Sequence, residues 1–338
     1  MKRSLLVFAA IATLLLVLAA PAQASAAPPQ PRTVATLPYG ADGSFAESMT
    51  AVAGGNLYAS LTLWGDSNTG QIWKITPSGA TSLVASIDLG PAGALMGITH
   101  DSSGQLYVAD ADFSGTENSL IYKVGPGGSM TVVAYLPPGS WPNGLACHGG
   151  YLYAADSSLG AIWRVPLGGS AVKPKSPWFQ NALLAPGDPN VDPSAHGIGA
   201  NGIAFRGSSA YVTVSDSGRV VRIPVSAQGK AGTPCVFCRR SELRTADGVA
   251  FDKLGNLWVV TNEGPSAGQT GALYTVSPIG VLRQIAVSPS RFDYPTQPVF
   301  GTSAATLTTL FIVNGAFSGD AAPNVIGLNA GVTGQPLP

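Results

Sequence analysis

One sequence unit recurs six times along the chain, at intervals of 46 to 58 residues. Each copy contains an apolar strand, a tight turn, a second strand resembling L-Y-V-A-D, a loop, and a third strand resembling I-W-K-I. The second strands are expected to begin at Leu57, Leu106, Leu152, Ala210, Leu257 and Leu310. Because these intervals match the period of propeller blades, the sequence predicts an all-β, six-bladed β-propeller.

An additional strand near the N-terminus, residues 32–37, precedes these six units. The sixth unit ends after its third strand, which is expected at 324–328. We therefore expect the N-terminal strand to complete the last blade, close the ring and remove an open sheet edge. A two-sheet sandwich also contains regularly spaced short strands, but it does not require the same residue strings to recur in register.

Residues 1–26 have the pattern of a signal peptide. Two basic residues precede an apolar run, Leu5–Ala20, and small residues suited to cleavage follow it. A membrane anchor is the alternative, but the run is shorter than the ~20 residues of a spanning helix, and several prolines follow. We expect a secreted, extracytoplasmic protein with one propeller domain over residues 27–338 and no membrane contact after cleavage.

The charge distribution argues against some classes of partner. The chain carries 18 basic and 18 acidic residues, and its Lys and Arg residues do not cluster, whereas a nucleic acid or a membrane surface needs a basic patch. Long loops at 110–119, 173–200, 262–271 and 314–323 fall on one predicted face of the ring and indicate a walled pocket there. We expect a monomer that acts on a small-molecule substrate.

The first residues of the innermost strands should meet at the channel on that same face. Counting back nine or ten residues from the second strands gives Glu47, Met96, Asn143, Asn201 and Asp247, with the sixth position near Phe300. Two carboxylates and two amides form a hard-oxygen set, which suits Ca²⁺ better than Mg²⁺ with its strict octahedron. Zinc would need His or Cys ligands. The set predicts a calcium site, with another divalent metal as the alternative.

Turn chemistry is a second explanation for part of this pattern. Asn-Gly and Asp-Gly are common turn dipeptides and would account for Asn143, Asn201 and Asp247 without a metal. They do not account for Glu47, which is followed by Ser and keeps the same offset. The metal interpretation therefore depends on Glu47.

Four segments carry a family resemblance: ESMTAVAGGNLYAS (47–60), PNGLACHGGYLYAADS (142–157), NGIAFRGSSAYVTVSD (201–216) and DGVAFDKLGNLWVVTN (247–262). They resemble the gluconolactonase and senescence-marker-protein (regucalcin) family of six-bladed propellers. The resemblance implies that Glu47, Asn201 and Asp247 bind the metal, with Asn143 beside it as a catalytic residue. It also implies hydrolysis of a lactone or related ester, in which the metal polarises the carbonyl and Asp247 assists attack by water.

Met96 departs from the pattern of some related propellers. Paraoxonase-like lactonases look similar at this ring of oxygens but often carry a catalytic His at the blade-two position, so Met96 argues against a histidine mechanism. Strictosidine-synthase-like propellers also resemble the repeat but generally lack the metal residues. Candidate substrate-binding residues are Met96, Asn143, His196 in the long insertion, and Trp141. Solvation of a loop would explain His196 as well, and packing between blades would explain Trp141.

Cys235 and Cys238 form a CVFC pair in a chain expected to be exported, where oxidising conditions favour pairing. We expect a small disulfide loop, because a redox site would need a strand-to-helix context and zinc would need two further ligands. Cys147 should be a buried apolar residue.

Three functions are consistent with the sequence. A calcium-dependent hydrolase of lactones or related esters is the leading hypothesis. A non-catalytic ligand-binding propeller with a structural metal is the second, and a metal-assisted lyase or isomerase is the third. They have to be separated at the level of the site, because propellers perform many functions.

Overall fold

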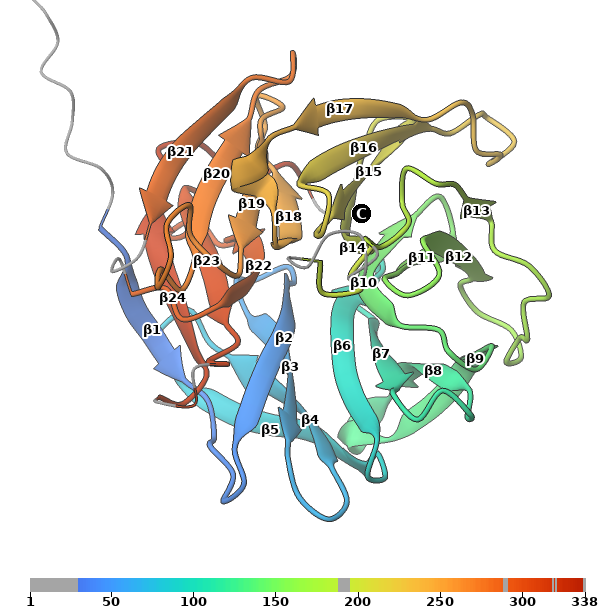
Figure 1. The fold of residues 1–338 in the computed structure, drawn as a ribbon. Coiled ribbons are helices and arrows are strands. Elements are labelled where there is room, and N and C mark those ends of the chain that lie inside the picture. Colours follow the sequence, from blue (N-terminus) through green and yellow to red (C-terminus); the bar gives the residue numbers. More distant parts are fainter. Residues whose placement is uncertain (1–29, 188–194, 288–290, 318, 320, 337–338) are drawn as a thin grey trace, which may run out of the picture.

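The computed structural model describes residues 30–187, 195–287, 291–317, 319 and 321–336. Its strands form six four-stranded antiparallel sheets arranged as blades around a central axis (Figure 1). The predicted six-bladed β-propeller is therefore confirmed. The predicted signal peptide, residues 1–26, lies outside the described residues. Within the described ranges, no helix is long and apolar enough to cross a membrane.

The four strands of each blade follow one another from the axis outwards. In blades one to three they are β2 (Ser44–Ala51), β3 (Leu57–Leu63), β4 (Thr69–Ile75) and β5 (Thr81–Asp88); β6 (Gly93–His100), β7 (Leu106–Asp112), β8 (Ser119–Val124) and β9 (Met130–Leu136); and β10 (Pro142–His148), β11 (Tyr151–Asp156), β12 (Ala161–Pro166) and β13 (Phe179–Gln180).

In blades four to six the strands are β14 (Ala200–Arg206), β15 (Ser209–Val214), β16 (Arg219–Pro224) and β17 (Cys235–Arg239); β18 (Ala246–Phe251), β19 (Leu257–Thr261), β20 (Ala272–Val276) and β21 (Leu282–Val287); and β22 (Pro295–Phe300), β23 (Thr309–Asn314), β24 (Asn324–Asn329) and β1 (Arg32–Thr36). Two short 3-10 helices, η1 (Pro126–Gly128) and η2 (Ser241–Leu243), lie in loops.

The repeat located the strands well. Each second strand begins within one residue of the position expected from the sequence. The N-terminal strand closes the ring as predicted, because β1 pairs antiparallel with β24, from Arg32 opposite Gly327 to Thr36 opposite Asn324. The last blade thus combines strands from both ends of the propeller, and β1 covers the outer edge of β24.

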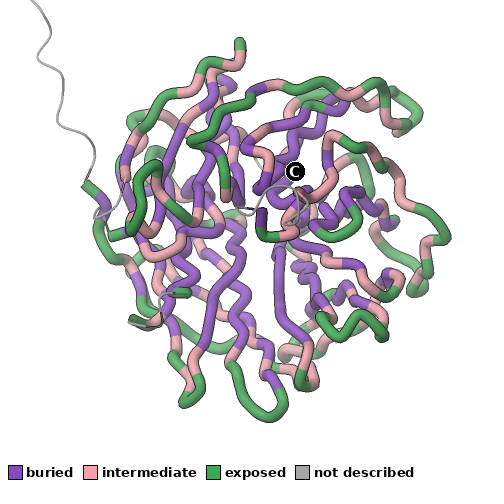
Figure 2. The backbone as a smooth tube through the Cα atoms, viewed as in Figure 1, coloured by how far each residue is buried: buried purple, intermediate pink, exposed green. Residues whose placement is uncertain are grey.

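Six hydrophobic clusters hold the ring together, one at each junction between neighbouring blades. Trp163 and Trp258 lie in such clusters. The innermost strands are buried along most of their length, whereas exposed residues gather in the loops and on the outer strands (Figure 2). Since each blade buries a face on both neighbours, the position of the innermost strands is set by packing on two sides.

The structure corrects the expected disulfide. Cys235 and Cys238 are both free thiols on the single strand β17. The two side chains have different surroundings, since Cys235 is exposed and Cys238 is buried. Cys147 is free and buried, as predicted.

Candidate functional site

The predicted oxygen-bearing residues lie in the first half of the innermost strands of blades one, three, four and five. All four are buried: Glu47 is 6% exposed, Asn143 3%, Asn201 3% and Asp247 5%. Their strands begin one to three residues earlier than expected, so these residues lie inside strands rather than at the first position. The site is therefore part of the wall of the channel.

The sixth position is Thr296, and the expectation near Phe300 is wrong. Every innermost strand has a register shift against its second strand, and the shift in β22 lies between Pro295 and Gln297, on either side of Thr296. The corresponding shifts in the other blades fall at Glu47, Met96, Asn143, Asn201 and Asp247. These five residues and Thr296 are called the ring residues below.

The glycines that follow the ring residues have a packing role rather than a turn role. A Cβ added to Gly144 would come within 3.0 Å of the carbonyl oxygen of Asn201, and one added to Gly202 within 3.0 Å of that of Asp247. No real Cβ atom tolerates such a distance, so only Gly allows neighbouring innermost strands to approach so closely. The proposed Asn-Gly and Asp-Gly turns are therefore wrong, because the glycines bring successive ring residues together.

Two serines fix the orientation of the ring amides. The Ser215 hydroxyl donates to a carbonyl oxygen of blade five over 2.6 Å, so its oxygen accepts from Asn201 Nδ2 over 3.1 Å. The arrangement recurs one blade earlier, where Ser157 donates over 2.8 Å and accepts from Asn143 Nδ2 over 3.3 Å. Because each serine holds an amide nitrogen, the amide oxygen, Oδ1, points away from it.

The amide oxygen of Asn201 has no hydrogen-bond partner among the described residues, although it is buried. Leaving a buried carbonyl oxygen unpaired costs about 1–3 kcal/mol. A cation or a donor placed at this oxygen would remove that cost. The atom therefore marks a position where a ligand fits.

The two ring carboxylates lie close to each other. Burial, and then the Asp247 carboxylate, raise the pKa of Glu47 well above its ordinary value. Burial likewise raises the pKa of Asp247 to about 7, although hydrogen bonds from Asn262 and Asn201 oppose the rise. Asn262 Nδ2 donates to Asp247 Oδ2 over 2.8 Å, whereas no described residue donates to the Glu47 carboxylate. Two buried acids without a neighbouring cation favour the binding of a positive ion.

The chemistry of this donor set fits a hard divalent cation. Glu47 and Asp247 offer carboxylate oxygens, and Asn201 offers a free amide oxygen. Calcium takes mixed carboxylate and amide oxygens in a flexible geometry. Nowhere in the described ranges do three or more His, Cys, Asp or Glu residues gather, so a zinc-type ligand set is not present there.

Blade two departs from the polar pattern at two positions. Met96 is 2% exposed and packs in an apolar cluster with Phe45 and Leu145. Ala111 takes the place that Ser157 has in blade three, as the pairing of β6 with β7 shows. Blade two therefore provides neither an oxygen nor a residue to orient one, and its side of the ring is apolar.

An aromatic surface lies beside this apolar side and was missed by the sequence reasoning, apart from Trp141. Phe45 stacks on Trp64 at 5.0 Å and contacts Phe317 at 5.5 Å, and Phe113 meets Trp141 edge-on at 5.1 Å. Trp64, Phe113 and Phe317 are 39–49% exposed. Each follows a second strand, at the face where the long loops lie, and this shared position is the signal that could have found them.

The remaining histidine and tryptophan candidates have different surroundings. His196 is exposed at the end of the long insertion, and no described residue forms a hydrogen bond with its ring. Trp141 is half-buried, and its Nε1 has no partner among the described residues. Asp216 fixes this insertion, since its carboxylate accepts backbone N–H groups of Gly187, His196 and Ile198 over 2.8–2.9 Å. Neither candidate is brought against the ring carboxylates by a described contact.

No family model matches the sequence, and no curated protein matches it. The fold is similar to several solved propellers. The calcium-binding protein regucalcin of Agrobacterium tumefaciens strain C58 is 18% identical, with a TM-score of 0.61 over 92% of this chain and 96% of that chain. A glucose dehydrogenase-like oxidoreductase of Thermus thermophilus is 14% identical, with a TM-score of 0.53 over 89% and 99%. A protein of unknown function from Bacteroides caccae is 12% identical, with a TM-score of 0.53 over 80% and 98%. At these identities the likeness shows the fold.

Proposed function

We propose that this protein is a calcium-dependent hydrolase of lactones or related esters, related to the gluconolactonase and regucalcin propellers. In this proposal it is exported by its N-terminal signal peptide and acts outside the cytoplasm, as a monomer, on a small molecule. Neither a nucleic acid nor a membrane is a partner. The calcium-binding regucalcin of similar fold supports the choice of metal.

One observation carries the proposal. The buried carboxylates of Glu47 and Asp247 lie close together, and the buried amide oxygen of Asn201 in the same ring is without a partner among the described residues. Such a set is unfavourable without a cation and favourable with one. The residues that would hold the ion are Glu47, Asn201 and Asp247.

The chain's own groups account for the remaining chemistry. When bound, a Ca²⁺ ion would supply a Lewis acid that polarises the substrate carbonyl. Asp247, held by Asn262, takes a proton from water as the water oxygen bonds to the carbonyl carbon. The same carboxyl returns the proton to the alkoxide oxygen when the C–O bond breaks. Asn143, oriented by Ser157, forms a hydrogen bond with the substrate.

The aromatic surface gives the substrate an apolar side. A lactone held with its carbonyl at the ring residues would extend toward Met96 and the exposed rings of Phe113 and Trp64. A lactone is a more reactive electrophile than an amide. It therefore suits calcium, which activates water only weakly.

A lactone panel tests the proposal. Chelator-treated protein should be inactive, and added Ca²⁺ should restore hydrolysis. Asp247→Asn should lose activity by at least about a hundredfold, since general base catalysis contributes 10²–10⁴-fold. Asp66→Asn is the matched control, because Asp66 is exposed to solvent. If the wild type and Asp247→Asn hydrolyse the panel equally, the enzymatic proposal fails.

A structural metal in a binding propeller is the second candidate. The observation that favours it is the burial of the ring residues, none of the four polar ones in blades one, three, four and five exceeding 6% exposure. An ion enclosed in this way would stabilise the ring. Calcium that raises the melting temperature while no substrate is turned over would support this second function.

A further inference from the structure

The channel contains a large cavity beyond the ring residues, toward the C-terminal ends of the innermost strands. Its volume is about 580 Å³, within the range of ligand sites. The lining residues follow the ring residues along the innermost strands. Apolar side chains dominate, including Met49, Ile98, Leu145, Ile203 and Val249, and no Asp or Glu lines it.

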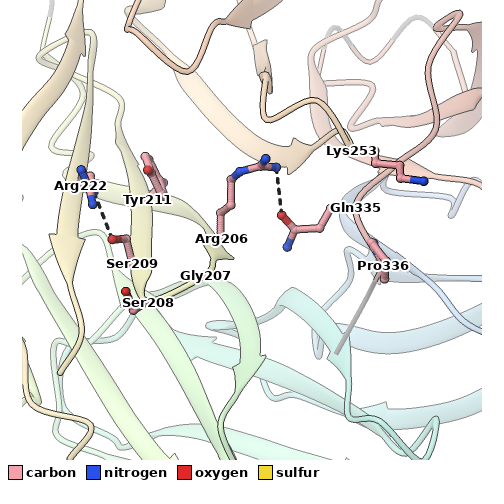
Figure 3. A pocket seen from close by; sticks show the side chains of 9 residues that line it. All are labelled: Arg206, Gly207, Ser208, Ser209, Tyr211, Arg222, Lys253, Gln335 and Pro336. Carbon is pink, nitrogen blue, oxygen red and sulfur yellow. Dashed lines mark hydrogen bonds between the residues drawn. The ribbon is translucent and has the colours of Figure 1, made fainter. Parts of the chain in front are cut away.

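A basic hollow of about 530 Å³ adjoins this cavity on the outer surface. Arg206, Arg222 and Lys253 contribute three cationic groups, and again no acidic residue lines it (Figure 3). Arg222 Nε donates to Ser209 over 3.1 Å, and Lys253 is exposed. None of the three cations forms an ion pair with a described residue. The hollow and the cavity share Lys253, Gln335 and Pro336, so they meet.

The C-terminal segment, residues 333–336, lies against the innermost strands of blades five and four, where the two spaces meet. Gln335 holds it there, since its backbone N–H donates to Phe251 and its Nε2 to Phe205, both over 2.9 Å. Arg206 donates to the Gln335 side chain over 3.4 Å. The segment therefore forms part of the wall between an apolar interior and a cationic rim.

We propose that this end of the channel is a second ligand site, which binds an organic anion with an apolar body, such as a medium-chain carboxylate. The hydrocarbon chain lies between the innermost strands, and the carboxylate lies at Lys253, where the cavity and the basic hollow meet. A neutral ligand would not form an ion pair with the cationic groups of the hollow, and an anion without an apolar body would not fill the apolar cavity. The site is separate from the candidate metal site and does not depend on the proposed hydrolysis.

Calorimetric titration with hexanoate, octanoate, decanoate and octan-1-ol tests this proposal. Each added CH₂ group should tighten binding about fourfold, because a buried CH₂ is worth about 0.8 kcal/mol. Octanoate should bind more tightly than octan-1-ol. Lys253→Met should weaken octanoate about fivefold and leave octan-1-ol unchanged. Lys123→Met, at an exposed lysine of β8, is the matched control and should change neither.

Filling the cavity gives an independent readout. Ala204 and Ala250 both line it, and Ala204→Leu and Ala250→Leu should each weaken both ligands while the melting temperature shows that the variant is folded. Neither Asp247→Asn nor chelator should change the binding of octanoate or octan-1-ol, so a failure of the proposed hydrolysis would not affect this test. Affinity independent of chain length, equal binding of acid and alcohol, or full binding by both leucine variants would overturn the proposal.

Discussion

Replacing Asp247 by Asn should stabilise the metal-free protein and abolish its stabilisation by calcium. Burial raises the pKa of Asp247 from 3.8 to about 7. A carboxyl with a raised folded pKa contributes stability that is present below its unfolded pKa and lost as the pH rises through 7. At 1.36 kcal/mol per pKa unit, the wild type without metal loses about 4 kcal/mol between pH 4 and pH 8 from this group.

The asparagine side chain in the Asp247→Asn variant carries no charge, so the variant should escape this loss. With chelator at pH 8, Asp247→Asn should therefore melt above wild type, by about 6 °C if all 4 kcal/mol is recovered in a chain of this length. The difference should disappear near pH 4. With calcium at a hundred times its Kd, the wild type gains about 2.7 kcal/mol and the variant gains nothing.

Differential scanning calorimetry from pH 4 to pH 8, with chelator and with calcium, measures both effects. Asp66→Asn should follow wild type throughout, because Asp66 is exposed. A variant that is less stable than wild type in chelator at pH 8 would show that the buried Asp247 carboxylate does not destabilise the metal-free protein. Equal stabilisation of both proteins by calcium would refute the assignment of Asp247 as a ligand.

Three further predictions follow from local packing. Gly202→Ala should lower the free energy of unfolding by about 3 kcal/mol in a urea melt, because the added Cβ meets the Asp247 carbonyl oxygen. Gly65→Ala, where the atom nearest to the added Cβ is 3.4 Å away, should lower it by less than about 1 kcal/mol. Similar losses in both variants would contradict the packing role of Gly202. Asp216→Ala removes the acceptor of three backbone N–H groups and should speed proteolysis between residues 173 and 200, and an unchanged cleavage rate would contradict it. Denatured protein, unfolded without reductant, should titrate three thiols, and one thiol would show that Cys235 and Cys238 are bridged.

The repeat made the fold predictable because each blade needs the same strand pattern to pack on its neighbours. The strings around Leu106 and Leu257 recur for that reason, and β7 and β19 begin at those residues. Thr296 was missed because blade six lacks the Asn-Gly or Asp-Gly pair that marks blades three to five. The register shift that identifies it is a property of strand pairing, which no single residue type signals.

The candidate site was predictable in composition but not in its supporting contacts. Glu47 and Asp247 could be aligned by counting, and they are electrostatic neighbours. The role of Ser215 could not be read from the sequence, because it depends on a hydroxyl that bonds to the next blade. Cys235 and Cys238 misled for a related reason, since their spacing predicted a loop, whereas both lie on the strand β17.

The position of a bound ion decides whether Glu47, Asn201 and Asp247 form a metal site. Crystals grown with calcium should give one anomalous difference peak at the ring, within about 2.3–2.6 Å of oxygens of Glu47, Asn201 and Asp247. The same peak should be absent from Glu47→Gln crystals. A wild-type map with no peak there, at a calcium concentration that stabilises the protein, would contradict the account.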